Sequence, residues 1–148
     1  MKTSLFIGLL ILLTKLSFGQ QVKQNIDYQY YRDDKSYYAF ELFRNIADDK
    51  AIVNLNFTTN TAFKKIDKIY ITNGVKEVKL KFKTRSDVVE SDNPELKFHA
   101  ISLNIKDLAN KEIDCEAKIV FKLDNGLIYT LPFSRCNLDE QLTQLTKF

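Results

Sequence analysis

Five tyrosines lie within a few residues of one predicted turn and form the first candidate binding site. The turn is centred on Asp34, and the sequence on both sides of it alternates as a β-hairpin does. A tyrosine ring joins a flat apolar face to a polar hydroxyl, so an exposed cluster could stack against a glycan. If the two strands pair symmetrically about Asp34, Tyr31 and Tyr37 remain exposed and are the candidate binding residues. This pairing turns three tyrosines toward the core with their hydroxyls at the rim: Tyr28, Tyr30 and Tyr38.

A row of lysines at alternate positions is the second candidate site. Lys79, Lys81 and Lys83 would project from one face of a strand. They could bind an acidic polysaccharide or another negatively charged surface. The competing interpretation is a solvated outer face whose lysines discourage edge-to-edge sheet pairing. We favour the second interpretation, because exposed strands commonly carry lysines for that purpose.

The sequence offers little for catalysis or metal binding. His99 is the only histidine, and the chain lacks both a Gly-x-Ser-x-Gly elbow and a phosphate-binding glycine loop. Carboxylates between Arg85 and Glu95 could hold Ca²⁺, but their spacing matches no EF-hand loop, which favours an ordinary solvated loop. We therefore predict no enzyme activity, no metal and no cofactor. The least favoured alternative is a glycoside hydrolase that uses two of four glutamates: Glu41, Glu90, Glu112 and Glu116.

Cys115 and Cys136 are the only cysteines, and they bracket a hairpin signal at Asn125-Gly126. We predict that they form a disulfide, because the chain reads as an exported protein and the spacing is unlike a redox Cys-x-x-Cys pair. A two-residue turn would place the cysteines directly opposite each other. A three-residue loop that starts at Asp124 gives a better apolar face but misaligns them by one residue. We favour this loop, with a β-bulge near Pro132 to restore the alignment.

Two more hairpins are predicted upstream. The pairing about Asp34 places Tyr28 opposite Phe40, although a helix over residues 37–46 competes with the second strand. Residues 66–72 and 75–83 flank Asn73-Gly74, and a two-residue turn there places Ile69 opposite Val78.

The remaining segments add two strands and a helix. Residues 51–58 alternate as a half-buried strand with Val53, Leu55 and Phe57 on one face. Residues 96–105 are predicted to form a strand in which the apolar residues change from one face to the other. This change predicts a bulge near His99. A short helix is expected to begin at Asn137, which with Glu140 resembles a capping box. Its apolar stripe comprises Leu138, Leu142 and Leu145.

Residues 1–19 have the pattern of a secretory signal peptide. A lysine at position 2 precedes an apolar run over residues 5–13, which is shorter than the ~20 residues that span a bilayer. The whole chain carries 22 basic and 19 acidic residues. Removing Lys2 and Lys15 with the signal leaves 20 basic residues and a net charge of +1, so the balance does not indicate nucleic-acid binding. Residues 20–148 are predicted to form one domain.

The strand pattern predicts an all-β fold. Seven or eight short strands with a short C-terminal helix favour an antiparallel β-sandwich, with a small barrel as the alternative. The predicted function is non-catalytic binding of a glycan or a protein through loops and an exposed sheet face. The alternative is an inhibitor or structural subunit that pairs its sheet edge with a partner protein. We predict a secreted or periplasmic protein with no transmembrane segment in the mature chain.

Overall fold

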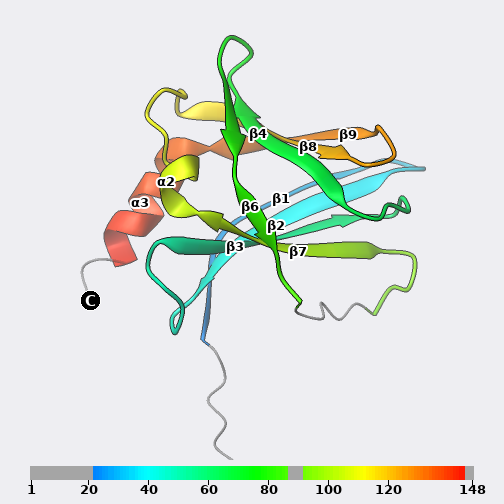
Figure 1. The fold of residues 1–148 in the computed structure, drawn as a ribbon, viewed down its shortest axis with the longest axis horizontal. Coiled ribbons are helices and arrows are strands. Elements are labelled where there is room, and N and C mark those ends of the chain that lie inside the picture. The colour runs from blue at the N-terminus through cyan, green and yellow to red at the C-terminus, as the bar shows by residue number, and fades with distance from the viewer. Residues whose placement is uncertain (1–21, 87–91, 146–148) are drawn as a thin grey trace, which may run out of the picture.

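The computed structural model describes residues 22–86 and 92–145 and shows two antiparallel β-sheets packed face to face (Figure 1). Sheet A contains, in spatial order, β1 (Lys23–Arg32), β2 (Tyr37–Asn45), β3 (Ile52–Thr59), β7 (Lys97–Asn104) and β6 (Phe82–Thr84). Sheet B contains β5 (Glu77–Leu80), β4 (Ile66–Thr72), β8 (Glu116–Leu123) and β9 (Ile128–Ser134). The predicted all-β class is confirmed, and the two open sheets do not close into the alternative barrel. The predicted signal peptide lies outside the described residues.

Two short helices complete the described fold. Helix α2 (Ile105–Leu108) follows β7, and Asn104 caps it by accepting a hydrogen bond from the main-chain N–H of Lys106. Helix α3 (Arg135–Leu145) follows β9 and lies at the end of the sandwich near α2 (Figure 1).

Aromatic side chains join the two sheets at the centre of the core. The ring of Phe57 on β3 stacks on Phe121 of β8, with centroids 4.4 Å apart. Phe40 of β2 lies 6.3 Å from the same Phe121 ring. All three side chains are at most 1% exposed. Because truncating a buried phenylalanine to alanine costs about 3–5 kcal/mol, this cluster is a major source of stability.

Strand β3 is buried on both faces, so the prediction of a half-buried strand is wrong. Val53, Leu55 and Phe57 face the core as predicted. Asn54 and Asn56 on the other face are only 2% and 8% exposed. Their amides are satisfied, because they donate hydrogen bonds to the carboxylates of Asp48 and Glu41 respectively. The polar residues of this strand therefore belong to a buried layer on the outer side of sheet A.

The segment after the Asn73-Gly74 turn belongs to both sheets. Strand β5 pairs with β4 in sheet B, and after Lys81 the chain continues as β6, which pairs with β7 in sheet A. The predicted single strand over residues 75–83 is therefore wrong. The predicted β4–β5 register is also displaced by two residues, since Ile71 and not Ile69 lies opposite Val78. A shift of two residues preserves the faces, so Ile69 and Leu80 still reach the core.

The register of the β8–β9 hairpin is the one favoured from the sequence. Phe121 lies opposite Tyr129, and the N–H of Leu123 donates to the carbonyl of Leu127 across a three-residue loop. Gly126 in that loop has a φ of +85°, which a residue without Cβ adopts without strain. Pro132 lies opposite Lys118 between the hydrogen-bonded pairs, so its missing N–H removes no ladder bond.

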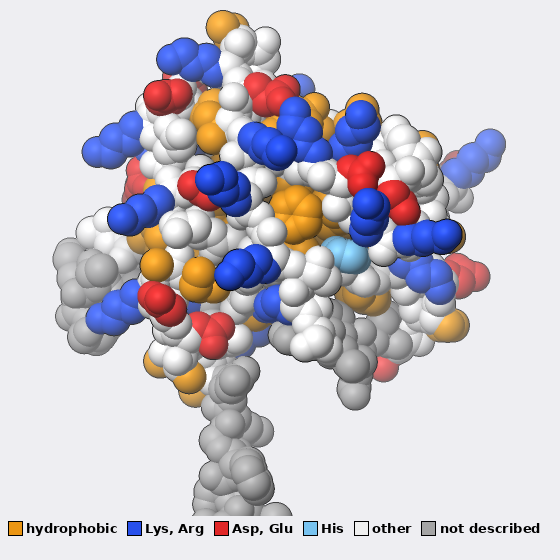
Figure 2. Space-filling view, in the orientation of Figure 1, with side chains coloured by type: hydrophobic (Ala, Val, Ile, Leu, Met, Phe, Trp, Pro, Cys, Tyr) orange, Lys and Arg blue, Asp and Glu red, His pale blue; other side chains and the backbone are white. Residues whose placement is uncertain are grey.

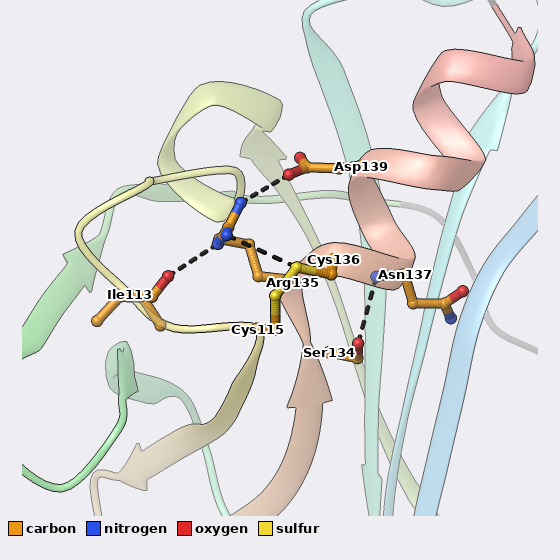
Figure 3. The surroundings of a disulfide bond; sticks show 7 residues. All are labelled: Ile113, Cys115, Ser134, Arg135, Cys136, Asn137 and Asp139. Atoms are coloured by element: carbon orange, nitrogen blue, oxygen red, sulfur yellow. Dashed lines mark hydrogen bonds and ion pairs between the residues drawn. A yellow bond between two sulfur atoms is a disulfide. The ribbon is translucent and has the colours of Figure 1, made fainter.

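The disulfide between Cys115 and Cys136 is present, but the bulge predicted near Pro132 is not (Figure 3). Strand β9 ends at Ser134, and the first turn of α3 brings Cys136 back over Cys115, with the two Cα atoms 4.9 Å apart. The helix thus achieves the alignment that a bulge was expected to provide. It also begins two residues before the predicted Asn137, whose N–H is bound by the hydroxyl of Ser134.

Arg135 ties this junction to the preceding loop. Its main-chain N–H donates to the carbonyl of Cys115 at 2.9 Å. Its Nε donates to the carbonyl of Ile113 at 2.8 Å, as Figure 3 shows. Its guanidinium also pairs with Asp139 one helical turn later. The disulfide and Arg135 therefore fix the start of α3, from which Leu138 packs into the core.

The register of β1 differs from the prediction by one residue. Tyr30 lies opposite Ala39, whereas the pairing about Asp34 had placed it opposite Tyr38. The carboxylate of Asp33 accepts hydrogen bonds from the main-chain N–H groups of Lys35 and Ser36, which closes a two-residue loop. A one-residue shift moves every side chain of a strand to the other face. The predicted inward direction of Tyr28 and Tyr30 is therefore wrong. The strand predicted after the turn, as far as Leu42, is confirmed over the competing helix, and β2 continues it to Asn45.

Strand β7 is regular at His99, so the predicted bulge is wrong there too. Its pairing with β3 runs without a shift from Lys97 to Asn104. The apolar phase slips because both faces of the strand are covered: Phe98 lies on the outer side and Ile101 in the core. A bulge does occur in sheet A at Ile26 of β1, which thereby reaches the core.

The double substitution Cys115→Ser and Cys136→Ser tests the contribution of the disulfide. We expect the free energy of unfolding in urea to fall by about 2–3 kcal/mol, since the bond closes a loop of 21 residues that is already held by a hairpin. Native protein treated with a reducing agent should match the variant. A change below ~0.5 kcal/mol would show that Arg135 and the hairpin hold the junction without the bond.

Candidate functional site

Three tyrosines share the outer face of sheet A, and we refer to Tyr28, Tyr30 and Tyr37 as the tyrosine platform. Tyr28 and Tyr30 are 55% and 61% exposed, and their ring centroids are 6.0 Å apart. The register places them opposite Glu41 and Ala39 of β2. The small side chain of Ala39 is buried between β1 and β3. The arrangement offers two aromatic faces to solvent side by side.

A hydrogen bond fixes one edge of the platform. The hydroxyls of Tyr28 and Tyr37 lie 3.1 Å apart. This bond, together with partial burial, raises the pKa of Tyr28 to about 12. Tyr37 itself is anchored by Asn60, whose side-chain oxygen accepts the main-chain N–H of Tyr37. The platform is therefore held by the loop that follows β3 as well as by its own hairpin.

A polar network lies next to the platform on the same face. The carboxylate of Glu41 accepts hydrogen bonds from Lys23 and from the amide of Asn56. The amide oxygen of Asn56 in turn accepts a hydrogen bond from Arg85 at 2.9 Å. Lys23 and Arg85 also lie over the Phe43 ring, at 4.2 Å and 5.2 Å from its centroid. These paired groups rigidify the outer layer of sheet A beside the exposed rings.

A polar cleft of about 400 Å³ lies at the end of sheet A next to the platform. Three loops form it: the β1–β2 loop, the start of the β3–β4 loop, and the segment before β7. The side chains of Arg32, Asp34 and Lys35 line it and have no hydrogen-bond or ion-pair partner among the described residues. Tyr37 lines the cleft too, so the cleft and the platform are continuous. The cleft thus supplies unpaired hydrogen-bonding groups beside an aromatic surface.

The predicted candidate Tyr31 lies on the opposite side of β1 from the platform. Its ring stacks on Tyr38 at a centroid distance of 5.0 Å, and Tyr38 contacts Tyr129 at 4.7 Å. Its hydroxyl donates to Asp33, which raises the pKa of Tyr31. Tyr31 is 44% exposed, but it forms the outer end of an aromatic chain that leads into the core. Of the two tyrosine candidates, the structure brings only Tyr37 into the platform.

The three candidate lysines are divided between the sheets. Lys79 lies on edge strand β5 of sheet B, Lys83 on edge strand β6 of sheet A, and Lys81 between them. All three are exposed. Figure 2 shows Lys and Arg side chains spread over this side of the molecule with carboxylates between them. The row expected along one strand is therefore not a feature of a single sheet face.

His99 is half-buried beside the ring of Phe63, with ring centroids 5.5 Å apart. Burial lowers its pKa, so the imidazole is neutral at pH 7. No group of three or more His, Cys, Asp or Glu side chains in the described ranges is placed to hold a metal ion. Part of the acidic loop considered for Ca²⁺, residues 87–91, lies outside those ranges. None of the described helices has the length and apolar character needed to cross a membrane.

No protein-family model, curated protein sequence or solved structure matches the chain.

Sequence analysis missed Tyr28 and Tyr30 as surface residues. A signal for their direction was present in Asp33, because an aspartate can accept hydrogen bonds from main-chain N–H groups two and three residues later. Such a loop contains two residues and selects the observed register. The apolar pattern favoured the register that turns Tyr28 and Tyr30 inward. It could do so because β1 carries aromatic rings on both faces.

The substitution Tyr37→Phe tests the hydrogen bond within the platform. We expect the pKa of Tyr28 to fall from about 12 toward 10, measured by tyrosinate absorbance. The folded protein holds this proton more tightly than the unfolded chain, so the bond stabilises fully below pH 10 and its contribution is lost as the pH rises toward 12. That loss should be absent in the variant. A Tyr70→Phe control on sheet B should leave the Tyr28 transition in place, and an unchanged transition in Tyr37→Phe would contradict the geometry.

Proposed function

We propose that the protein is an exported, non-catalytic glycan-binding module whose site is the tyrosine platform with its adjoining polar cleft. The side-by-side exposure of Tyr28 and Tyr30 on one sheet face is the observation that carries this proposal. Exposed aromatic rings that lie next to each other are typical of interaction sites, whereas single exposed rings are common on any surface. The rings here are held in place by the hairpin and by Tyr37 before any ligand arrives.

The chemistry of a sugar ring suits this arrangement. A pyranose has an apolar face of C–H groups and a rim of hydroxyls, so it stacks on tyrosine and forms hydrogen bonds at its edge. Arg32, Asp34 and Lys35 supply donors and acceptors at the cleft, next to Tyr37. Because the supporting network around Glu41 is already paired, little conformational entropy is lost on binding. The disulfide agrees with an extracellular or periplasmic location.

The substitutions Tyr28→Ala and Tyr30→Ala test the proposal on an array of neutral and acidic glycans, followed by calorimetry with the glycan that binds best. Each should weaken binding by at least about tenfold, because each removes one stacking surface. Neighbouring Tyr31→Ala is the matched control, since it removes a tyrosine from the other face of the same strand.

The platform variants and the Tyr31→Ala control distinguish a role of the platform from a general effect of losing a tyrosine. Loss of binding in Tyr30→Ala with retention in Tyr31→Ala supports the platform. Equal affinity of Tyr28→Ala, Tyr30→Ala and the native protein for that glycan would refute it, as would the absence of any glycan ligand. Thermal unfolding of each variant confirms that the comparison is made on folded protein.

A further inference from the structure

A group of lysines crosses three strands on the outer face of sheet B, far from the tyrosine platform on sheet A. The register places Lys68 of β4 directly opposite Lys122 of β8. Lys79 of β5 lies opposite Tyr70, two residues along β4 from Lys68. Lys81 follows the last residue of β5 that pairs with β4. We refer to Lys68, Lys79, Lys81 and Lys122 as the lysine cluster.

The lysine cluster has little compensating charge. Lys68 pairs with Glu77 at 2.5 Å and lies over the Tyr70 ring, 4.5 Å from its centroid. The other three lysines are exposed and have no ion-pair partner among the residues that the structure describes. Figure 2 shows several basic side chains close together in the upper part of the view, where β4 and β8 lie in Figure 1. The surface therefore carries net positive charge.

Like charges directly opposite each other in a sheet destabilise the fold. Solubility alone does not require such a pair, because alternating lysine and glutamate across the strands would keep the face soluble without repulsion. Glu77 offsets part of the charge of Lys68, whereas Lys79, Lys81 and Lys122 have no ion-pair partner among the described residues. A bound anion would reduce the repulsion that remains.

We infer that the lysine cluster binds a linear acidic polysaccharide. Three adjacent strands at about 4.8 Å spacing spread the ammonium groups over roughly 10 Å of open sheet, which suits charges repeated along an extended chain. Lysine acts as a point charge on a flexible stem and does not impose the bidentate geometry that selects a single phosphate. Tyr70, half-buried at the centre of the cluster, holds the ammonium group of Lys68 over its ring and so fixes one of the positive charges.

The double variant Lys68→Gln with Lys122→Gln tests this inference against heparin as the probe. We expect heparin affinity to fall by about tenfold and the salt concentration for elution from heparin resin to fall with it. Lys106→Gln with Lys111→Gln removes the same charge elsewhere and is the matched control. The single variant Lys122→Gln should also raise the Tm of the free protein by about 2 °C, because it relieves the repulsion. Added heparin should raise the Tm of the native protein more than that of the variant.

Three results would overturn the inference: equal heparin affinity in the double variant and the native protein, equal loss in the control, or stronger binding to vesicles of anionic phospholipid than to heparin. The variant Ile128→Gln distinguishes vesicle binding from heparin binding. Ile128 lies opposite Lys122 and is 57% exposed, so its replacement should weaken binding to vesicles but not to heparin. Tyr30→Ala should retain heparin binding, so the lysine cluster and the tyrosine platform succeed or fail independently.

Discussion

The register of β1 against β2 is the constraint on which the candidate site depends. Successive side chains of a strand point to opposite faces, so a slip of one residue would exchange the buried and exposed sets of β1. The carboxylate of Asp33 sets this register by binding two main-chain N–H groups of the loop, which lowers its own pKa. The bulge at Ile26 then returns the first part of the strand to the core. One short polar loop thereby decides that Tyr28 and Tyr30 face solvent.

The core explains how the outer face of sheet A can expose tyrosines without loss of the fold. Phe57 and Phe121 hold the two sheets together from within, and the disulfide fixes the start of α3 at one end of the sandwich. The outer side of sheet A is covered by Asn54, Asn56 and their hydrogen-bond partners together with the buried ring of Phe43. A surface built from paired polar groups tolerates exposed tyrosines without losing its structure. The inner face of these strands thus carries the core, and the outer face carries the tyrosine platform.

Local signals in the sequence predicted much of the fold. The position of Gly126 and the apolar pairs around it gave the β8–β9 register, and the cysteine count gave the disulfide. The exchange of sheets at Lys81 could not be predicted, because the apolar alternation continues through it and only tertiary packing breaks the strand.

The candidate sites were harder to predict, since each depends on register between strands. Alternation within one strand suggested a lysine row ending at Lys83, whereas the observed neighbours of Lys68 and Lys79 come from three strands. Nothing in the residues next to Lys122 indicated that it would lie beside the other lysines of the cluster. Aromatic residues on both faces of β1 likewise left the direction of its tyrosines undetermined by hydrophobicity.

Nuclear Overhauser contacts between β1 and β2 test the central claim most directly. The N–H of Asp33 donates to Ser36 at the loop, so Tyr30 and Ala39 form a non-hydrogen-bonded pair whose Cα atoms approach to about 4.5 Å. We expect a strong contact between the Hα protons of Tyr30 and Ala39. Cross-strand contacts that pair Tyr30 with Tyr38 instead would contradict this register, because they would require Tyr28 and Tyr30 to face the core.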